Sequence, residues 1–147
     1  MVFTFSEDIK AIDGTPDETE VSLLCSQENG YSSCGTKEAV EITGNMMTVN
    51  ISGIPDVRCL WVKVNGIADL EDNPLVGDND VYIVVLAGDV NDDGNTNLID
   101  MAAVKAKNGS DPTAPGMSKY DVNLDGQINL IDMAAVKGKN GGSAVCP

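Results

Sequence analysis

The chain contains no histidine, and only nine of its 147 residues are basic. The absence of histidine removes the commonest general base and any zinc site that depends on imidazole. The 23 acidic residues leave a formal net charge of −14, which argues against nucleic acids and anionic membranes as partners. No apolar run approaches the ~20 residues needed to cross a bilayer. Because nucleophile motifs and paired glutamates on adjacent predicted strands are also lacking, we expect a protein that is not an enzyme.

What the chain does have is a segment of 22 residues that occurs twice. Residues 89–110 return as residues 121–142 with 17 identical positions. Each copy has the form D-x-N-x-D-G-x-x-N-x-x-D and is followed by a short helix-like run. An EF-hand loop supplies oxygen ligands to calcium from positions 1, 3, 5, 7, 9 and 12, with glycine at position 6 where the chain turns sharply. The repeat therefore predicts two EF-hand-like loops that bind two calcium ions.

The predicted calcium ligands have oxygen-bearing side chains in both copies. Position 7 differs between the copies, as expected where only the backbone carbonyl coordinates. Two acidic turns that merely look alike would not require this chemistry at every ligand position twice. The ligands are Asp89, Asn91, Asp93, Asn95, Asn97 and Asp100 in the first loop, and Asp121, Asn123, Asp125, Gln127, Asn129 and Asp132 in the second.

Residues 1–87 are predicted to form an all-β module. Short apolar or alternating runs are separated by turn clusters at roughly ten-residue spacing, which favours an immunoglobulin-like or fibronectin-like sandwich. We expect the last run to be a central strand because it is nearly all apolar. For the single tryptophan, Trp61, we favour a position in the core over the alternative role of stacking on a sugar. The predicted strands are 2–5, 21–25, 39–42, 46–51, 60–64 and 81–86, and the turn at 43–45 predicts a hairpin.

Four cysteines at irregular spacing, together with calcium loops, suit an oxidising, extracellular or cell-surface setting. Four cysteines allow three pairings. We favour Cys25–Cys34, because a short excursion containing Gly, Ser and Asn joins these two residues.

The boundary between the modules is predicted at Ala87–Gly88, where the strand pattern stops, so that the second module comprises residues 88–147. A strand-like run, and no helix, precedes the first loop. Each repeat is therefore a loop with only its exiting helix, predicted over 98–107 and 130–139 and ending at Asn-Gly. Without entering helices there is no helix pair to open, which disfavours a calmodulin-like sensor.

These duplicated loop–helix units resemble the dockerin type I family. The resemblance covers residues 88–142, and it includes the terminal Asp100 and Asp132 and the tyrosine, Tyr120, directly before the second loop. It implies a small all-α domain that docks onto a cohesin domain, in a secreted bacterial protein linked to cellulosome-like polysaccharide catabolism or cell-surface assembly. The β-module is similar to the immunoglobulin-like units that precede such repeats. We expect a monomer.

The sequence departs from the family at loop positions 10 and 11, where type I dockerins usually have small hydroxyl residues. Here both loops have Leu-Ile, followed at helical spacing by small residues and one lysine. This mostly apolar stripe is the predicted partner-binding surface. It comprises Leu98, Ile99, Ala102, Lys105 and Ala106 in the first copy, and Leu130, Ile131, Ala134, Lys137 and Gly138 in the second.

Two interpretations of the stripe remain open. If the Leu-Ile pairs are exposed, the module docks a partner in a calcium-dependent manner, and the near-identity of the repeats predicts two binding orientations related by about 180°. If the pairs are buried, the module is a calcium-stabilised structural end with no cohesin partner. In both cases we expect Met101, Val104, Ile128, Met133 and Val136 to form the seam between the helices.

Overall fold

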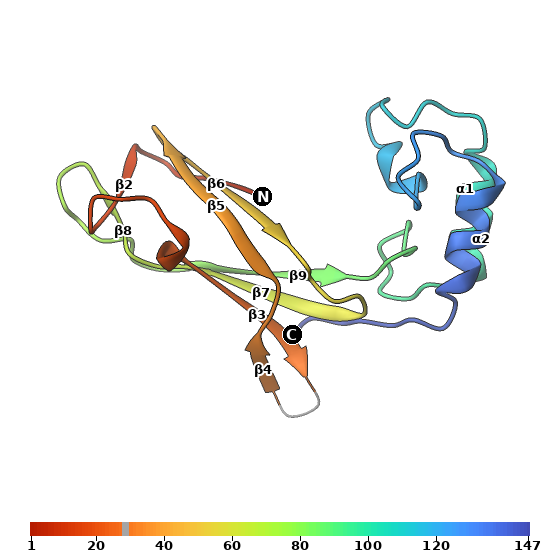
Figure 1. Cartoon of the computed structure of the whole chain (residues 1–147), viewed down its shortest axis with the longest axis horizontal. Coiled ribbons are helices and arrows are strands. Elements are labelled where there is room, and N and C mark those ends of the chain that lie inside the picture. The colour runs from red at the N-terminus through yellow and green to blue at the C-terminus, as the bar shows by residue number, and fades with distance from the viewer. Residues whose placement is uncertain (28–29) are drawn as a thin grey trace. The chain divides into compact units, whose positions relative to one another are not determined.

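The computed structural model describes residues 1–27 and 30–147, which form two compact units (Figure 1). The β-unit comprises Met1–Pro55, Cys59–Ile83 and Cys146–Pro147, and the loop–helix unit comprises Asp56–Arg58 and Val84–Val145. The main division of the structure falls between Ile83 and Val84. Two short segments belong to the unit that is more distant in sequence: Asp56–Arg58 to the loop–helix unit and Cys146–Pro147 to the β-unit. The segment that contains Asp56 belongs to the loop–helix unit because the Asp56 carboxylate accepts a hydrogen bond from the Ala87 N–H (2.7 Å).

The β-unit consists of three groups of hydrogen-bonded strands. They have the orders β1-β6-β5, β2-β8 and β4-β3-β7-β9. The strands are β1 (Val2–Thr4), β2 (Ile9–Ala11), β3 (Val21–Gln27), β4 (Gly30–Ser33), β5 (Thr36–Thr43), β6 (Met46–Ser52), β7 (Arg58–Val64), β8 (Ile67–Asp69) and β9 (Asp80–Val85), with a short 3-10 helix η1 at Glu18–Glu20.

Alternation along the strands creates the core of the β-unit. In β3 every second side chain is buried, beginning at Val21, and in β7 Leu60, Val62 and Val64 are buried in the same way. Side chains of successive strand residues point to opposite faces, so this pattern directs one apolar face inward. The predicted hairpin is confirmed, since β5 and β6 pair across a turn in which Gly44 has φ 59°.

Two expectations for the β-unit are wrong. β9 lies at the edge of its sheet, next to β7, and Val81 and Tyr82 on it are exposed. An apolar run does not distinguish a central strand from an edge strand, because the choice depends on which strands are available to pair on each side. Trp61 is half-buried on the outer face of the same sheet, opposite the buried Leu60 and Val62.

Two disulfides are present. Cys25–Cys34, the hairpin disulfide, joins β3 to the residue that follows β4 and is the pairing that the sequence favours. Cys59–Cys146, the long-range disulfide, joins residues 87 positions apart. Once Cys25 pairs with Cys34, Cys59 is the one cysteine left as a partner for Cys146, and the structure contains this bond.

The loop–helix unit contains α1 (Leu98–Ala106), the 3-10 helix η2 (Ser118–Tyr120) and α2 (Leu130–Gly138). The two α-helices pack together over a small core, as the predicted seam requires. No helix in the described part of the chain is long and apolar enough to span a membrane. The core consists of Val90, Val104, Ile128 and Val136, with Met101, Ala103, Met117, Tyr120, Val122 and Met133 packed against it.

Candidate metal centres

The first loop is folded by hydrogen bonds from its own backbone to its acidic side chains. Asp89 accepts the N–H of Asp93 at one carboxylate oxygen (3.1 Å) and the N–H of Gly94 at the other (2.8 Å). The Asn91 side-chain oxygen also accepts from the Asp93 N–H (3.0 Å). Gly94 has φ 81°, a conformation that glycine adopts without strain. The loop thus closes around positions 1, 3 and 5.

Asp100, at position 12, joins the end of the loop to its beginning. It is 0% exposed. Its Oδ1 accepts the N–H groups of Val90 (3.0 Å) and Asn91 (3.2 Å), and its Oδ2 accepts the N–H of Asn97 (2.9 Å). The last bond is one half of a capping box, since the Asn97 side chain caps α1 in return. One buried carboxylate therefore closes the loop and starts the helix.

The second loop repeats this arrangement. Asp132 is 0% exposed and accepts N–H groups from Val122 (2.8 Å), Asn123 (3.2 Å) and Asn129 (2.8 Å). Asp121 accepts from the backbone N–H groups at positions 5 and 6 of its own loop, as Asp89 does. The nearly identical sequence thus gives the same local structure twice.

The two repeats also hold each other through matching backbone bonds. The N–H of Gly109, after α1, donates to the carbonyl of Ile128 in the second loop (2.8 Å). The N–H of Gly141, after α2, donates to the carbonyl of Thr96 in the first loop (2.9 Å). Thr96 and Ile128 both occupy position 8. This reciprocity gives the unit an approximate two-fold relation between its halves.

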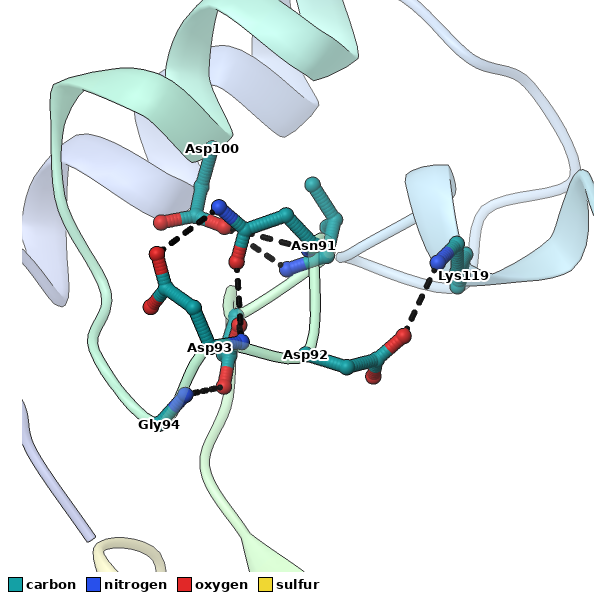
Figure 2. Close-up of polar contacts among 8 residues, drawn as sticks. Asn91, Asp92, Asp93, Gly94, Asp100 and Lys119 are labelled. Carbon is teal, nitrogen blue, oxygen red and sulfur yellow. Dashed lines mark hydrogen bonds and ion pairs between the residues drawn. The ribbon is translucent and has the colours of Figure 1, made fainter.

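The halves differ at position 4 and at the end of the unit. Asp92 points away from the other acidic side chains of its loop and pairs with Lys119 at 3.0 Å (Figure 2). Its counterpart Leu124 is 84% exposed and has φ 60°. The chain after α2 also runs along the first loop only, where the N–H of Ala144 donates to the carbonyl of Gly94 (3.1 Å).

Among the described residues, the predicted ligand carboxylates have no cationic partner. In residues 1–27 and 30–147 the lysine–carboxylate pairs involve Asp56, Asp72 and Asp92, none of which is a predicted ligand. Each loop therefore concentrates three predicted ligand aspartates, one of them fully buried, whose hydrogen-bond donors are neutral. Such a concentration of negative charge favours binding of a cation.

The donor chemistry fits calcium. Each carboxylate oxygen has two lone pairs. Asp89 uses one on each oxygen for N–H groups, and Asp100 uses two on Oδ1 and one on Oδ2. Both residues therefore retain a lone pair for a hard cation, which prefers oxygen ligands. Among the described residues no three Asp, Glu, Cys or His side chains converge as a metal-binding group, because the carboxylates are directed at the loop N–H groups and the other predicted ligands are amide or backbone oxygens.

The side chains at loop positions 10 and 11 are exposed. Leu98, Ile99, Leu130 and Ile131, named here the Leu-Ile patch, are between 60% and 69% exposed. The other members of the predicted stripe are exposed as well. The small core between the helices is filled by Val104 and Val136 instead. Within the loop–helix unit, the Leu-Ile patch is therefore not part of the core.

This geometry can be compared with known families. The sequence model of the dockerin type I domain matches residues 87–139. The dockerin match covers both loops, α1 and α2. Dockerin type I domains bind calcium and dock onto cohesin domains. No curated protein and no solved structure matches the chain.

Two contacts that hold the loop–helix unit together were not predicted from the sequence. The hydrogen bond from the Ala144 N–H to the first loop corresponds to no sequence motif, because a backbone–backbone bond does not require particular side chains. Lys139, at the end of α2, pairs with Asp56 (2.8 Å) from a distant part of the chain. Burial alone would raise the pKa of Asp56, but hydrogen bonds from the Ala87 N–H and from Lys139 lower it below its usual value.

Proposed function

We propose that the chain is a calcium-dependent docking module whose partner is a cohesin-type domain, carried by a secreted bacterial protein at or outside the cell surface. The observation that carries this proposal is the exposure of the Leu-Ile patch directly behind two loops of calcium-binding composition. The module acts by binding, as a monomer, and not by catalysis. The β-unit would be an immunoglobulin-like spacer, and the parent protein would serve polysaccharide degradation or surface assembly.

Two calcium ions would be held, one in each loop, by the oxygen atoms at positions 1, 3, 5, 7, 9 and 12. Calcium would supply the cationic partner that the three predicted ligand aspartates of each loop do not have among the described residues. The chain's own residues then connect the loop to the docking surface. Asp100 and Asp132 are at once predicted ligands and capping residues, so a cation that orders either loop also fixes the first turn of the helix behind it.

The docking surface would consist of the exposed stripe on the two helices. Monomeric proteins rarely expose contiguous apolar side chains without a function in binding. Each half of the surface offers a leucine and an isoleucine at the start of its helix, with a lysine, Lys105 or Lys137, two turns further on. This composition favours apolar docking over the hydroxyl contacts usual for the family.

The near-identity of the halves leads to a more specific hypothesis. Four of the five differences between the repeats lie outside the stripe, the exception being Ala106 in place of Gly138. The backbone bonds between the halves are reciprocal. A partner that binds one helix would therefore find nearly the same surface after a rotation of about 180°, so that two binding orientations are available.

The test is a binding assay with variants of the Leu-Ile patch. The variants are Leu98→Ser/Ile99→Ser, Leu130→Ser/Ile131→Ser, and both pairs combined. Binding to a panel of cohesin domains is measured by calorimetry with excess calcium and again with a chelator. The matched control is Leu124→Ser, since Leu124 is at least as exposed but lies outside the stripe. Circular dichroism verifies that each variant keeps its helices.

We expect each single-pair variant to retain most of the affinity, and the combined variant and the chelated protein to lose binding. Loss from one pair alone would contradict the two orientations but not the docking surface. Full affinity of the combined variant would contradict the docking surface itself. If the calcium-loaded wild-type chain binds no cohesin, the alternative of a structural end module replaces the proposal.

A further inference from the structure

The outer face of the β4-β3-β7-β9 sheet carries a cluster of aromatic side chains that the docking module does not use. Trp61 and Tyr82 stack with ring centroids 5.5 Å apart and planes at 11°, and Tyr31 meets Trp61 edge-on at 5.6 Å. The whole chain has only six aromatic residues, so half of them lie in this cluster. Aromatic side chains usually contribute to a core, yet Tyr82 here is 37% exposed, on an edge strand.

A pocket of about 390 Å³ lies on the same sheet, beside the cluster. Leu24 is the cross-strand neighbour of Trp61 and also lines the pocket, and Lys63 reaches from the pocket to within 4.8 Å of the Trp61 ring centroid. The volume is within the range of small-ligand sites, roughly 300–1,000 Å³. The remaining polar lining consists of Ser22, Ser33, Lys37 and Asn65.

The polar groups of the pocket favour a ligand with both hydroxyl groups and one negative charge. Within the described part of the chain, neither Lys37 nor Lys63 has a carboxylate within 4.0 Å, although acidic residues outnumber basic ones by 23 to nine. Lys37 donates to backbone carbonyls, one of them that of Val21 (2.8 Å). The Lys63 ammonium lies over the Trp61 ring and has no hydrogen-bond or ion-pair partner among the described residues, which leaves it available to a ligand anion.

A sugar ring carrying a carboxylate meets these requirements together. The C–H face of a pyranose packs on aromatic rings, its hydroxyl groups match the serine and asparagine side chains, and the carboxylate of a uronic acid matches Lys63. The net charge of −14 repels ligands with many charges. We propose that this face of the β-unit binds a largely neutral oligosaccharide bearing an isolated uronic acid. The exposed Tyr82 is the apolar platform and Lys63 is the carboxylate-binding residue, while Trp61 packs against both and positions them.

This site is independent of the docking function, because all of its residues belong to the β-unit. The test can therefore be made on the full chain in the presence of a calcium chelator. Trp61 is the only tryptophan, so its fluorescence emission reports directly on the site. The probes are xylotriose bearing one glucuronic acid branch, unbranched xylotriose, and tetragalacturonate.

We expect the branched probe to change the Trp61 emission saturably. Unbranched xylotriose should bind at least about tenfold more weakly, in line with the loss of one charge-assisted contact. Tetragalacturonate should also bind at least about tenfold more weakly, because the net charge of −14 repels its four carboxylates. Lys63→Met should weaken binding of the branched probe about tenfold, whereas Lys63→Arg should retain it. The matched control is Lys10→Met, which removes the same charge from an exposed lysine of the same unit that pairs with Asp72.

Three results would overturn the proposal. One is the absence of a saturable emission change with the branched probe. Another is an affinity for unbranched xylotriose equal to that for the branched probe, which would show that the carboxylate contributes nothing to binding. This comparison uses the wild-type chain alone. The third is an unchanged affinity in Lys63→Met. Thermal unfolding of each variant distinguishes loss of the site from loss of the fold.

Discussion

Asp100→Asn should destabilise the loop–helix unit far more than Asp92→Asn, although both changes remove one negative charge from the same loop. Asp100 is fully buried and accepts three backbone N–H groups. An asparagine there replaces one acceptor oxygen by an NH₂ group, so at least one buried N–H loses its partner and faces another donor. Leaving a buried group of this kind unsatisfied costs about 1–3 kcal/mol, and more when a charged acceptor is lost. We expect a loss of about 3 kcal/mol.

Asp92 provides the matched comparison. Its carboxylate is exposed and pairs only with the exposed Lys119. Exposed pairs of this kind contribute about 0–1 kcal/mol. Asp92 also has φ 63°, a conformation that asparagine tolerates as well as aspartate does. Asp92→Asn should therefore leave the free energy of unfolding within about 1 kcal/mol of the wild type.

The assay is urea unfolding of the full chain at neutral pH with a fixed excess of calcium. Far-UV circular dichroism follows α1 and α2, and the emission of Trp61 follows the β-unit. A loss of about 3 kcal/mol is a large part of the stability of a small unit, so the helical signal of Asp100→Asn should disappear at a clearly lower urea concentration. Equal midpoints for the two variants would refute the reasoning that the buried N–H cluster, and not the charge alone, holds the loop.

Three further outcomes are expected. Leu124→Asn should raise the free energy of unfolding of the loop–helix unit by about 1 kcal/mol, and with it the Tm, because an exposed leucine at φ 60° is strained. An unchanged Tm would contradict the strain. Removal of the long-range disulfide should lower the free energy of unfolding by about 4.6 kcal/mol and removal of the hairpin disulfide by about 2.6 kcal/mol, because loops of 87 and 9 residues differ in chain entropy; a larger loss in denaturant unfolding from the hairpin disulfide would contradict this. The pKa of Asp56 is lower in the folded protein than its usual 3.8, so Asp56 contributes stability above that pH and loses the contribution as the pH falls through its folded value. The difference in stability between wild type and Asp56→Asn should accordingly be larger at neutral pH than at pH about 3, and a difference that is constant across this range would refute the assignment.

The loop–helix unit was predictable in detail because its structure follows from local sequence. The spacing of Asp89, Gly94 and Asp100 specifies a tight loop whose backbone N–H groups bind the loop's own carboxylates, and all of these bonds join residues at most ten positions apart. The helices begin directly after the capping residues Asn97 and Asn129. The seam followed from helical periodicity, because Val104 and Val136 recur on the face opposite the stripe.

The β-unit was predictable in its strands but not in their arrangement. Alternation identified β3, β7 and the β5–β6 hairpin, since the period of two is a property of each strand alone. Which strand lies at the edge depends on pairing between distant segments. β9 is as apolar as a central strand, yet it has a neighbour on one side only. Trp61 was misplaced for the same reason, because its face of the sheet is not covered.

The sequence by itself determined the two calcium-type loops, the helices that follow them and the chemistry of the predicted ligands, because each depends on residues close together in the chain. Tertiary structure decided which apolar side chains remain exposed. It buried Val104 and Val136 and left the Leu-Ile patch outside, it gathered Trp61 with Tyr82 on an outer face, and it brought Cys146 to Cys59. Each of these outcomes depends on which distant surface covers a residue, and that is a property of the packed chain and not of any short segment.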